Sequence, residues 1–130
     1  MDEVRRTVLF ATPPNGGSLR DALPVVERLW RRHVGECVEL APGWGTEPAP
    51  SIETPIEEVS EWIARWEAER RLVLGEGDLY LDAPGCRVIL CHDADLHIES
   101  DDAALLADAK AQFTAMRWRC VKAEKRERRL

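Results

Sequence analysis

The sequence predicts an α+β fold, in which a mixed sheet of five to six strands packs against three helices. Short apolar runs alternate with stretches of helical apolar spacing in the first half of the chain, whereas residues 78–99 hold three strand-like runs in succession. The expected order is strand, helix, strand, helix, three strands of a meander, helix and strand. At 130 residues the chain has the length of one domain, so we expect a single globular domain over residues 1–130.

The first three elements follow from apolar runs and the breakers between them. Residues 7–12 form an apolar run that predicts a buried strand. Ser18 is a good N-cap for the helix that follows, with Asp21 as its capping-box partner, and Pro24 either kinks this helix or moves its start later. Residues 37–40 predict a second strand, which a right-handed crossover would make parallel to the first.

A stretch rich in proline and glycine separates that strand from the second helix. Residues 41–53 are predicted to form a loop. The start of a helix then follows, with Thr54 as the cap, Pro55 in the first helical position and Glu57 reaching back to the cap. We expect this helix to end near Arg71.

Residues 78–82, 86–92 and 95–99 are predicted to form the meander, whose register decides which side chains face the core. A three-residue turn ending at Gly85, with a tight turn at Asp93-Ala94, separates apolar from polar side chains better than a two-residue first turn does. We therefore expect this register. It places Leu79, Leu81, Ile89, Cys91, Leu96 and Ile98 on the core face. It places Tyr80, Asp82, Val88, Leu90, His92, Asp95, His97 and Glu99 on the other face.

The C-terminal part is predicted to be a helix followed by a strand. Ser100, Asp101 or Asp102 caps the helix, and residues 117–123 form the strand. Residues 122–130 are mostly charged, so we expect a frayed tail there. The apolar stripe of the helix consists of Leu105, Leu106, Ala109, Phe113 and Met116.

Composition narrows the class of protein. The net charge of −6 argues against a nucleic-acid partner, because phosphate contacts need a basic surface. No apolar stretch approaches the roughly 18 residues that a membrane span needs, and the N-terminus has no signal-peptide pattern. No two of the four cysteines have C-x-x-C spacing. We therefore expect a cytoplasmic protein with no membrane partner.

The segment from Cys91 to His97 concentrates groups that can carry chemistry. In the expected register His92, Asp95 and His97 point the same way, and imidazoles beside carboxylates can bind a divalent metal or transfer protons. Polar residues at a hairpin end are more often a solvated sheet face, and no known ligand spacing is matched. We therefore assign no catalytic residue, metal ligand or cofactor. His92 and His97 stay weaker candidates for catalysis, as do His92, Asp95 and His97 for a metal.

The leading functional hypothesis is a small acidic protein that acts by binding a macromolecular partner, a protein with a basic surface. An inhibitor, immunity or antidote-type protein of a bacterial or phage conflict system fits the size, the acidity and the lack of a catalytic signature. The expected partner surface includes Trp44, Asp93, Asp95 and Glu99. The sequence does not choose an oligomeric state, and we do not expect an enzyme.

The alternative is a small module, with or without enzymatic activity, that binds a nucleotide or phosphate. Asn15, Gly16, Gly17 and Ser18 lie between a predicted strand and a predicted helix start, where backbone N–H groups can hold an anion. Neither a Walker lysine nor a G-x-G-x-x-G motif is present. A turn followed by a helix cap explains the same residues.

Overall fold

The computed structural model describes the backbone of residues 3–44, 47–48 and 51–128, and the side chains of residues 6–43 and 51–124. The strands are β1 (Glu3–Thr12), β2 (Cys37–Trp44), β3 (Glu47–Pro48), β4 (Ile52–Pro55), β5 (Asp78–Ala83), β6 (Cys86–Leu90), β7 (Leu96–Ser100) and β8 (Arg119–Arg128). The helices are α1 (Leu23–His33), α2 (Val59–Ala68) and α3 (Ala103–Ala115), with 3₁₀ turns η1 (Leu19–Ala22) and η2 (Ile56–Glu58).

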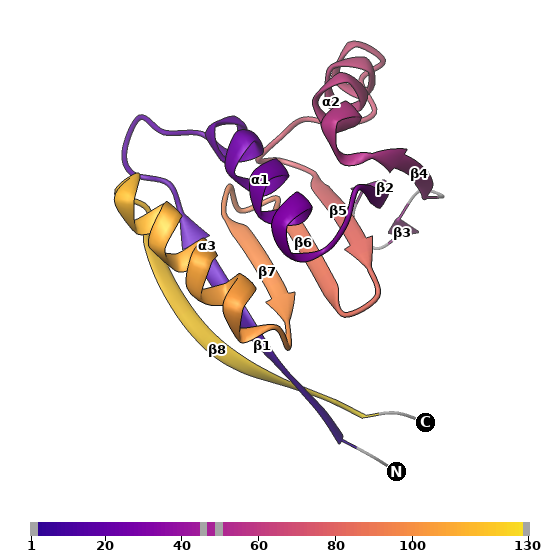
Figure 1. The fold of residues 1–130 in the computed structure, drawn as a ribbon. Coiled ribbons are helices and arrows are strands. Elements are labelled where there is room, and N and C mark those ends of the chain that lie inside the picture. Colours follow the sequence, from indigo (N-terminus) through magenta and orange to yellow (C-terminus); the bar gives the residue numbers. More distant parts are fainter. Residues whose placement is uncertain (1–2, 45–46, 49–50, 129–130) are drawn as a thin grey trace.

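The fold is α+β with three helices, as the sequence predicts, but the sheet differs from the prediction. The strands lie in the order β3-β2-β5-β6-β7-β1-β8, and β4 also pairs with β2. Each of these pairs is antiparallel, so the prediction of a mixed sheet of five to six strands is wrong. The crossover does bring β2 back in the direction of β1, but β7, β6 and β5 separate the two strands (Figure 1).

The additional strands lie in segments for which the sequence predicts irregular structure. Within the predicted loop 41–53, β2 continues to Trp44, and β3 and the start of β4 fold back against it. At the other end of the sheet, residues 122–128, which we expected in a frayed tail, belong to β8. They stay ordered as a strand because β1 pairs with β8 along its whole length, from Glu3 to Thr12.

The three helices pack their apolar stripes on the same face of the sheet, and α1 and α3 lie side by side in front of the strands in Figure 1. One continuous core cluster joins these stripes to the inward side chains of the strands. Trp30 of α1 is 1% exposed, and its Nε1 donates a hydrogen bond to the Cys37 carbonyl at 3.0 Å. This bond connects the end of α1 to the beginning of β2.

Two of the predicted helix starts can be compared with local geometry. Ser18 and Asp21 form the predicted capping box, but on the 3₁₀ turn η1, and α1 begins only at Leu23 with Pro24 in its first turn. Thr54 does not cap α2. It lies in β4, and its hydroxyl accepts a hydrogen bond from Trp62 Nε1 at 3.2 Å. The strand pairing of Thr54 thus outweighs its capping preference.

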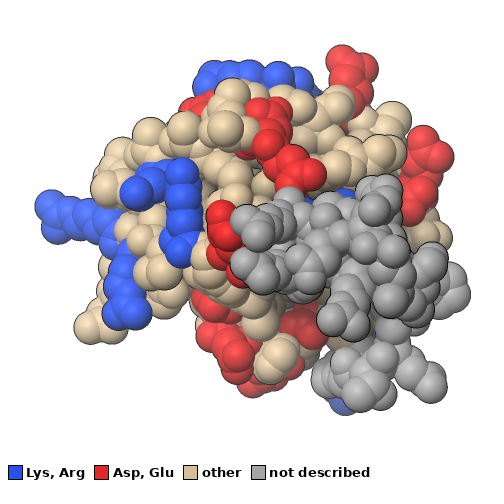
Figure 2. All heavy atoms as spheres, turned by 90° about the horizontal axis from the view of Figure 1, so that it is seen from below, with Lys and Arg blue, Asp and Glu red and all other residues tan. Residues whose placement is uncertain are grey.

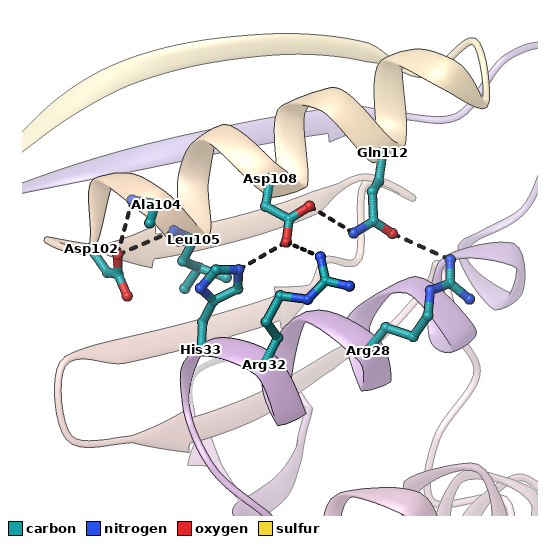
Figure 3. A network of polar contacts seen from close by, with 8 residues as sticks. All are labelled: Arg28, Arg32, His33, Asp102, Ala104, Leu105, Asp108 and Gln112. Atoms are coloured by element: carbon teal, nitrogen blue, oxygen red, sulfur yellow. Dashed lines mark hydrogen bonds and ion pairs between the residues drawn. The ribbon is translucent and has the colours of Figure 1, made fainter.

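The helix α3 begins as predicted and is tied to α1 by polar contacts. Asp102 is its N-cap, and its side chain accepts hydrogen bonds from the backbone N–H groups of Ala104 and Leu105. Further along, Asp108 binds three groups at once: Arg32 at 2.7 Å, His33 Nε2 at 2.8 Å and Gln112 Nε2 at 2.9 Å (Figure 3). Asp108 is therefore the central residue of the α1–α3 contact outside the core.

The register of the meander differs from the predicted one at both turns. Ala83 pairs with Cys86, so the first turn is the two-residue Pro84-Gly85, and Gly85 supplies the left-handed conformation with φ 79°. In the second turn Leu90 pairs with Leu96, which makes that turn longer than the expected Asp93-Ala94.

The changed lengths of the two turns reverse the faces of β6 but leave the faces of β5 and β7 as predicted. The inward positions of β5 and β7 are as predicted, with Leu79, Leu81, Leu96 and Ile98 in the core. Within β6 the two faces are exchanged: Val88 and Leu90 are core residues, whereas Ile89 lies between Tyr80 and His97 on the other face. Cys91 follows Ile89 by two residues and shares its face, contrary to the prediction.

None of the helices in the described part of the chain is both long enough and apolar enough to cross a membrane.

Candidate functional site

The sheet face opposite the helices carries two rows of side chains that run across the strands. The register of neighbouring strands aligns the first, the central row, which consists of Tyr80, Ile89, His97, Phe10 and Val121. The second, the charged row, consists of Glu53, Glu39, Asp82, Arg87 and Glu99. In the central row the rings of Phe10 and His97 meet edge to face, with centroids 4.6 Å apart, and Val121 is 49% exposed.

A third group of polar side chains adjoins the central row and shares His97 with it, where the turn between β6 and β7 meets the start of β5. We call this group the thiol cluster, and it consists of Asp78, Cys91, His92, Asp95 and His97. The turn closes with two hydrogen bonds, from the Cys91 N–H to the Asp95 carbonyl at 2.9 Å and from the Ala94 N–H to the Cys91 carbonyl at 3.0 Å. It therefore places Cys91, and not His92, across from Asp95.

Two imidazole–carboxylate pairs flank the Cys91 sulfur. On one side His92 Nδ1 lies 2.8 Å from Asp78 Oδ1 and 3.7 Å from Cys91 Sγ. On the other side His97 Nε2 lies 3.1 Å from Asp95 Oδ1. The sequence argument that Cys91 and His92 point to opposite faces is thus wrong, because His92 lies in the turn and is not bound by strand alternation.

The environment shifts the pKa values of Cys91, His92 and Asp78 in physically consistent directions. Burial raises the pKa of the Cys91 thiol to about 11, so the sulfur is protonated at neutral pH and is a poor nucleophile. The hydrogen bond to Asp78 raises the pKa of His92. For Asp78 burial acts in the upward direction, but the hydrogen bonds and charge of His92 together outweigh it and lower its pKa. The thiol cluster therefore does not show the activated thiolate of a nucleophilic enzyme.

The ligand atoms of the thiol cluster form two sets that could hold a metal ion. In the first set Asp78, Cys91 and His92 offer ligand atoms that lie within 4.8 Å of one another, and in the second set Cys91, Asp95 and His97 do so. Sulfur, imidazole nitrogen and carboxylate oxygen together suit zinc and related transition metals. The predicted trio of His92, Asp95 and His97 is thus divided between two sets, and Cys91 is the ligand they share.

The charged row borders a hollow of about 670 Å³ on the same face of the sheet. Its walls include the five residues Arg6, Glu39, Glu53, Arg87 and Glu99. Arg6 Nε is buried with no hydrogen-bond partner in the part of the chain that is described. Figure 2, seen from below, shows red acidic groups across the centre and lower part of the surface and along its upper and right side, with the blue basic groups mainly toward the left and top.

The structure places the predicted partner residues in different surroundings. Asp93 is well exposed at the turn, with 76% of its side chain accessible, and Asp95 is mostly buried in the thiol cluster. Glu99 lies on the expected face, but it is 5% exposed. The side chain of Trp44 lies outside the described residues.

The loop Asn15–Ser18 is arranged as a turn and a cap. The Gly17 N–H donates to the Pro14 carbonyl at 2.8 Å, and the Ser18 N–H donates to Asp21 Oδ2 at 3.0 Å. Gly16 takes the left-handed conformation, with φ 85°. Two of the N–H groups that an anion would need are therefore already engaged within the loop.

Sequence reasoning missed Cys91 and Asp78 as members of the site, as well as Glu39 and Glu53 in the charged row. A two-residue turn at Pro84-Gly85 turns Ile89 away from the core, and Cys91, two residues further along the chain, lies on the same side. No local signal indicates Glu53 as the neighbour of Glu39, because the prolines and glycines around residues 41–53 predict a loop where β4 begins.

Comparisons with protein-family models, with curated proteins and with solved structures found no match for this chain.

Proposed function

We propose that this protein is an acidic binding protein that acts through a macromolecular partner, and that a basic segment of a partner protein docks on the charged row. The observation that carries the proposal is the arrangement of carboxylates across the strands. Glu39 pairs in register with Glu53 on one side and with Asp82 on the other. An inhibitor or immunity-type role would be one form of such binding.

Folding alone gives no reason for this arrangement. Like charges directly opposite one another in a sheet are destabilising, by up to about 1 kcal/mol for a pair. Arg87 compensates Asp82, through a contact of 2.6 Å from its Nε to Oδ1, and it lies opposite Glu99 on its other side. Glu39 and Glu53 are exposed, and neither has a polar partner among the described side chains. A cationic partner would neutralise the repulsion between these carboxylates, and its binding would be stabilised by their negative charge.

The hollow and the central row supply the rest of a docking surface. The hollow is large enough for one or two long basic side chains, and Phe10, Ile89 and Val121 add apolar area beside it. Interfaces of this kind combine a few apolar or aromatic anchors with a charged rim that sets orientation and association rate.

Charge reversal tests the proposal with a matched control. The variant Glu39→Lys/Glu53→Lys reverses two charges of the row, and Glu58→Lys/Glu61→Lys makes the same change on exposed acids at the start of α2. Each variant and the wild type serve as bait in native-host extract, and the recovered partner is then purified and titrated at several salt concentrations.

We expect wild type and the α2 control to recover the same basic protein in stoichiometric amount. The row variant should bind the purified partner at least about tenfold more weakly and with a smaller dependence on salt. The proposal fails if no stoichiometric partner is recovered, or if both double variants bind the partner as tightly as wild type does.

No observation in the structure favours the nucleotide or phosphate alternative at Asn15, Gly16, Gly17 and Ser18. Two N–H groups of this loop already donate hydrogen bonds to neighbouring residues. The element that follows the loop is a four-residue 3₁₀ turn and not an α-helix with a strong dipole. We therefore do not propose it.

A further inference from the structure

We propose that the thiol cluster binds one divalent transition-metal ion, of which zinc is the best fit, through Cys91 Sγ, Asp95 and His97. These three residues come from the two sides of one hairpin turn and place sulfur, oxygen and nitrogen atoms within 4.8 Å of one another. The inference does not depend on the proposed partner binding, because that proposal rests on the carboxylates of the charged row, although His97 and Phe10 of the central row lie beside both sites.

The spacing of the imidazole and carboxylate ligand atoms is close to what a tetrahedral ion requires. With bonds of about 2.0–2.1 Å to oxygen and nitrogen and about 2.3 Å to sulfur, tetrahedral ligands lie roughly 3.3 Å (N to O) and 3.6 Å (N to S) apart. His97 Nε2 and Asp95 Oδ1 are 3.1 Å apart, and Cys91 Sγ lies within 4.8 Å of the ligand atoms of both residues. A bound ion would therefore draw the sulfur closer to the nitrogen and oxygen atoms, toward the tetrahedral spacing.

Burial and packing hold these ligands in place better than they hold the second set. Cys91 is 5% exposed, and the side chains of Asp95 and His97 are 23% and 21% exposed. Phe10 packs edge to face on the His97 ring and fixes its orientation. By contrast the side chain of His92 is 57% exposed, so we assign the ion to the Asp95–His97 side of the sulfur.

The position of Cys91 supports a role in binding over a role in packing. Cys91 does not belong to the core cluster, although it is almost fully buried. Its sulfur is surrounded by carboxylate and imidazole groups from both sides of the turn and from the start of β5. A residue such as valine or alanine would fill the same space without leaving a thiol among polar atoms, whereas a soft metal needs the sulfur.

Cobalt and zinc binding to the purified full-length chain test the proposal. Cobalt reports a thiolate ligand by a charge-transfer band in the near ultraviolet and a tetrahedral site by intense visible bands. Zinc affinity follows from competition with a chelator of known affinity. We expect one cobalt ion per chain with both signals, displacement by zinc, and a rise in melting temperature with zinc.

The variants Cys91→Ser and His97→Gln should each lose the tetrahedral cobalt spectrum and bind zinc more than about 100-fold more weakly. Cys37→Ser and His33→Gln are matched controls that remove an exposed thiol and a distant imidazole, and they should bind as wild type does. If Cys91→Ser does not fold, His97→Gln and Asp95→Asn decide in its place.

The proposal is overturned if excess cobalt gives no thiolate band with wild type. It is also overturned if Cys37→Ser removes the band or if Cys91→Ser keeps it. Capture of the basic partner by Glu39→Lys/Glu53→Lys is measured separately, so failure of the metal site and failure of the docking surface are distinguishable.

Discussion

Replacing Asp108 by asparagine should destabilise the fold without changing its shape. The carboxylate joins α1 to α3 through Arg32, His33 and Gln112 (Figure 3). Asparagine has almost the same size, but it lacks the charge, and its amide group would face other donors. The variant therefore measures the electrostatic part of the α1–α3 contact.

The pKa of Asp108 sets the expected magnitude. The hydrogen bond from Gln112, followed by those from His33 and Arg32, lowers this pKa to about 2. Against an unfolded value of about 3.9, the shift corresponds to roughly 2–3 kcal/mol if taken in full. The side chain of Arg32 is 61% exposed, so solvent screening reduces its share, and we expect a loss of about 1–2 kcal/mol at pH 7.

The lowered pKa of Asp108 also determines how the free energy of unfolding changes with pH. Because the folded pKa lies below the unfolded one, the stabilisation is fully present above about pH 4 and is lost as the pH falls toward about 2. The free-energy difference between wild type and Asp108→Asn should therefore shrink across this range, since only the wild type has a carboxylate to protonate at this position.

Urea unfolding of both proteins at pH 7 and at several values down to pH 2.5 gives the measurement. Asp101→Asn is the control, because Asp101 is an exposed acid just before the same helix. The reasoning is refuted if Asp108→Asn costs less than about 0.5 kcal/mol at pH 7, or if its difference from wild type does not change with pH.

Three further predictions test other parts of the structure. Thiol labelling of the native protein at neutral pH, followed by mass spectrometry, should modify the exposed Cys37 first and leave Cys86 protected, because burial raises the pKa of Cys86 to about 12; equal labelling rates would contradict this. Trp30→Phe should lower the free energy of unfolding by about 2–3 kcal/mol, since it removes a buried hydrogen bond and leaves a cavity, and chemical denaturation would measure this loss. Leu90→Ala should cost about 2–5 kcal/mol in the same assay and Ile89→Ala less than half as much, because Leu90 is in the core and Ile89 is on the other face; the opposite order would show that the register is wrong.

The helical parts of the fold could be predicted from the sequence because they depend on local signals. In η2 and α2 the stripe Ile56, Val59, Ile63 and Trp66 recurs at helical spacing, and all four residues are buried. The α3 stripe is buried in the same way up to Phe113, and Met116 is only half-buried because it is the C-cap. Periodicity over three or four turns leaves little choice of face.

The sheet was harder to predict because its pairing depends on residues far apart in the sequence. β3 and β4 fold from a segment whose prolines and glycines indicate a loop, and they are strands because β2 offers them a partner. A Cβ atom at position 43 would lie only 3.0 Å from the Tyr80 ring. The glycine at this position of β2 therefore allows β5 to approach closely. In the sequence alone, a glycine that ends a strand cannot be told from a glycine that lets a neighbouring strand come close.

The candidate site is more sensitive to register than the core is. Both faces of β6 offer apolar residues, Val88 and Leu90 on one and Ile89 on the other, so either register would fill the core acceptably. Only the observed register removes Cys91 from the core and places its sulfur between His92 and Asp95. A one-residue shift in a strand exchanges every side chain between the faces. The order of stability of Leu90→Ala and Ile89→Ala therefore tests the thiol cluster itself, since a strand with Leu90 outward would turn the Cys91 sulfur away from both imidazoles.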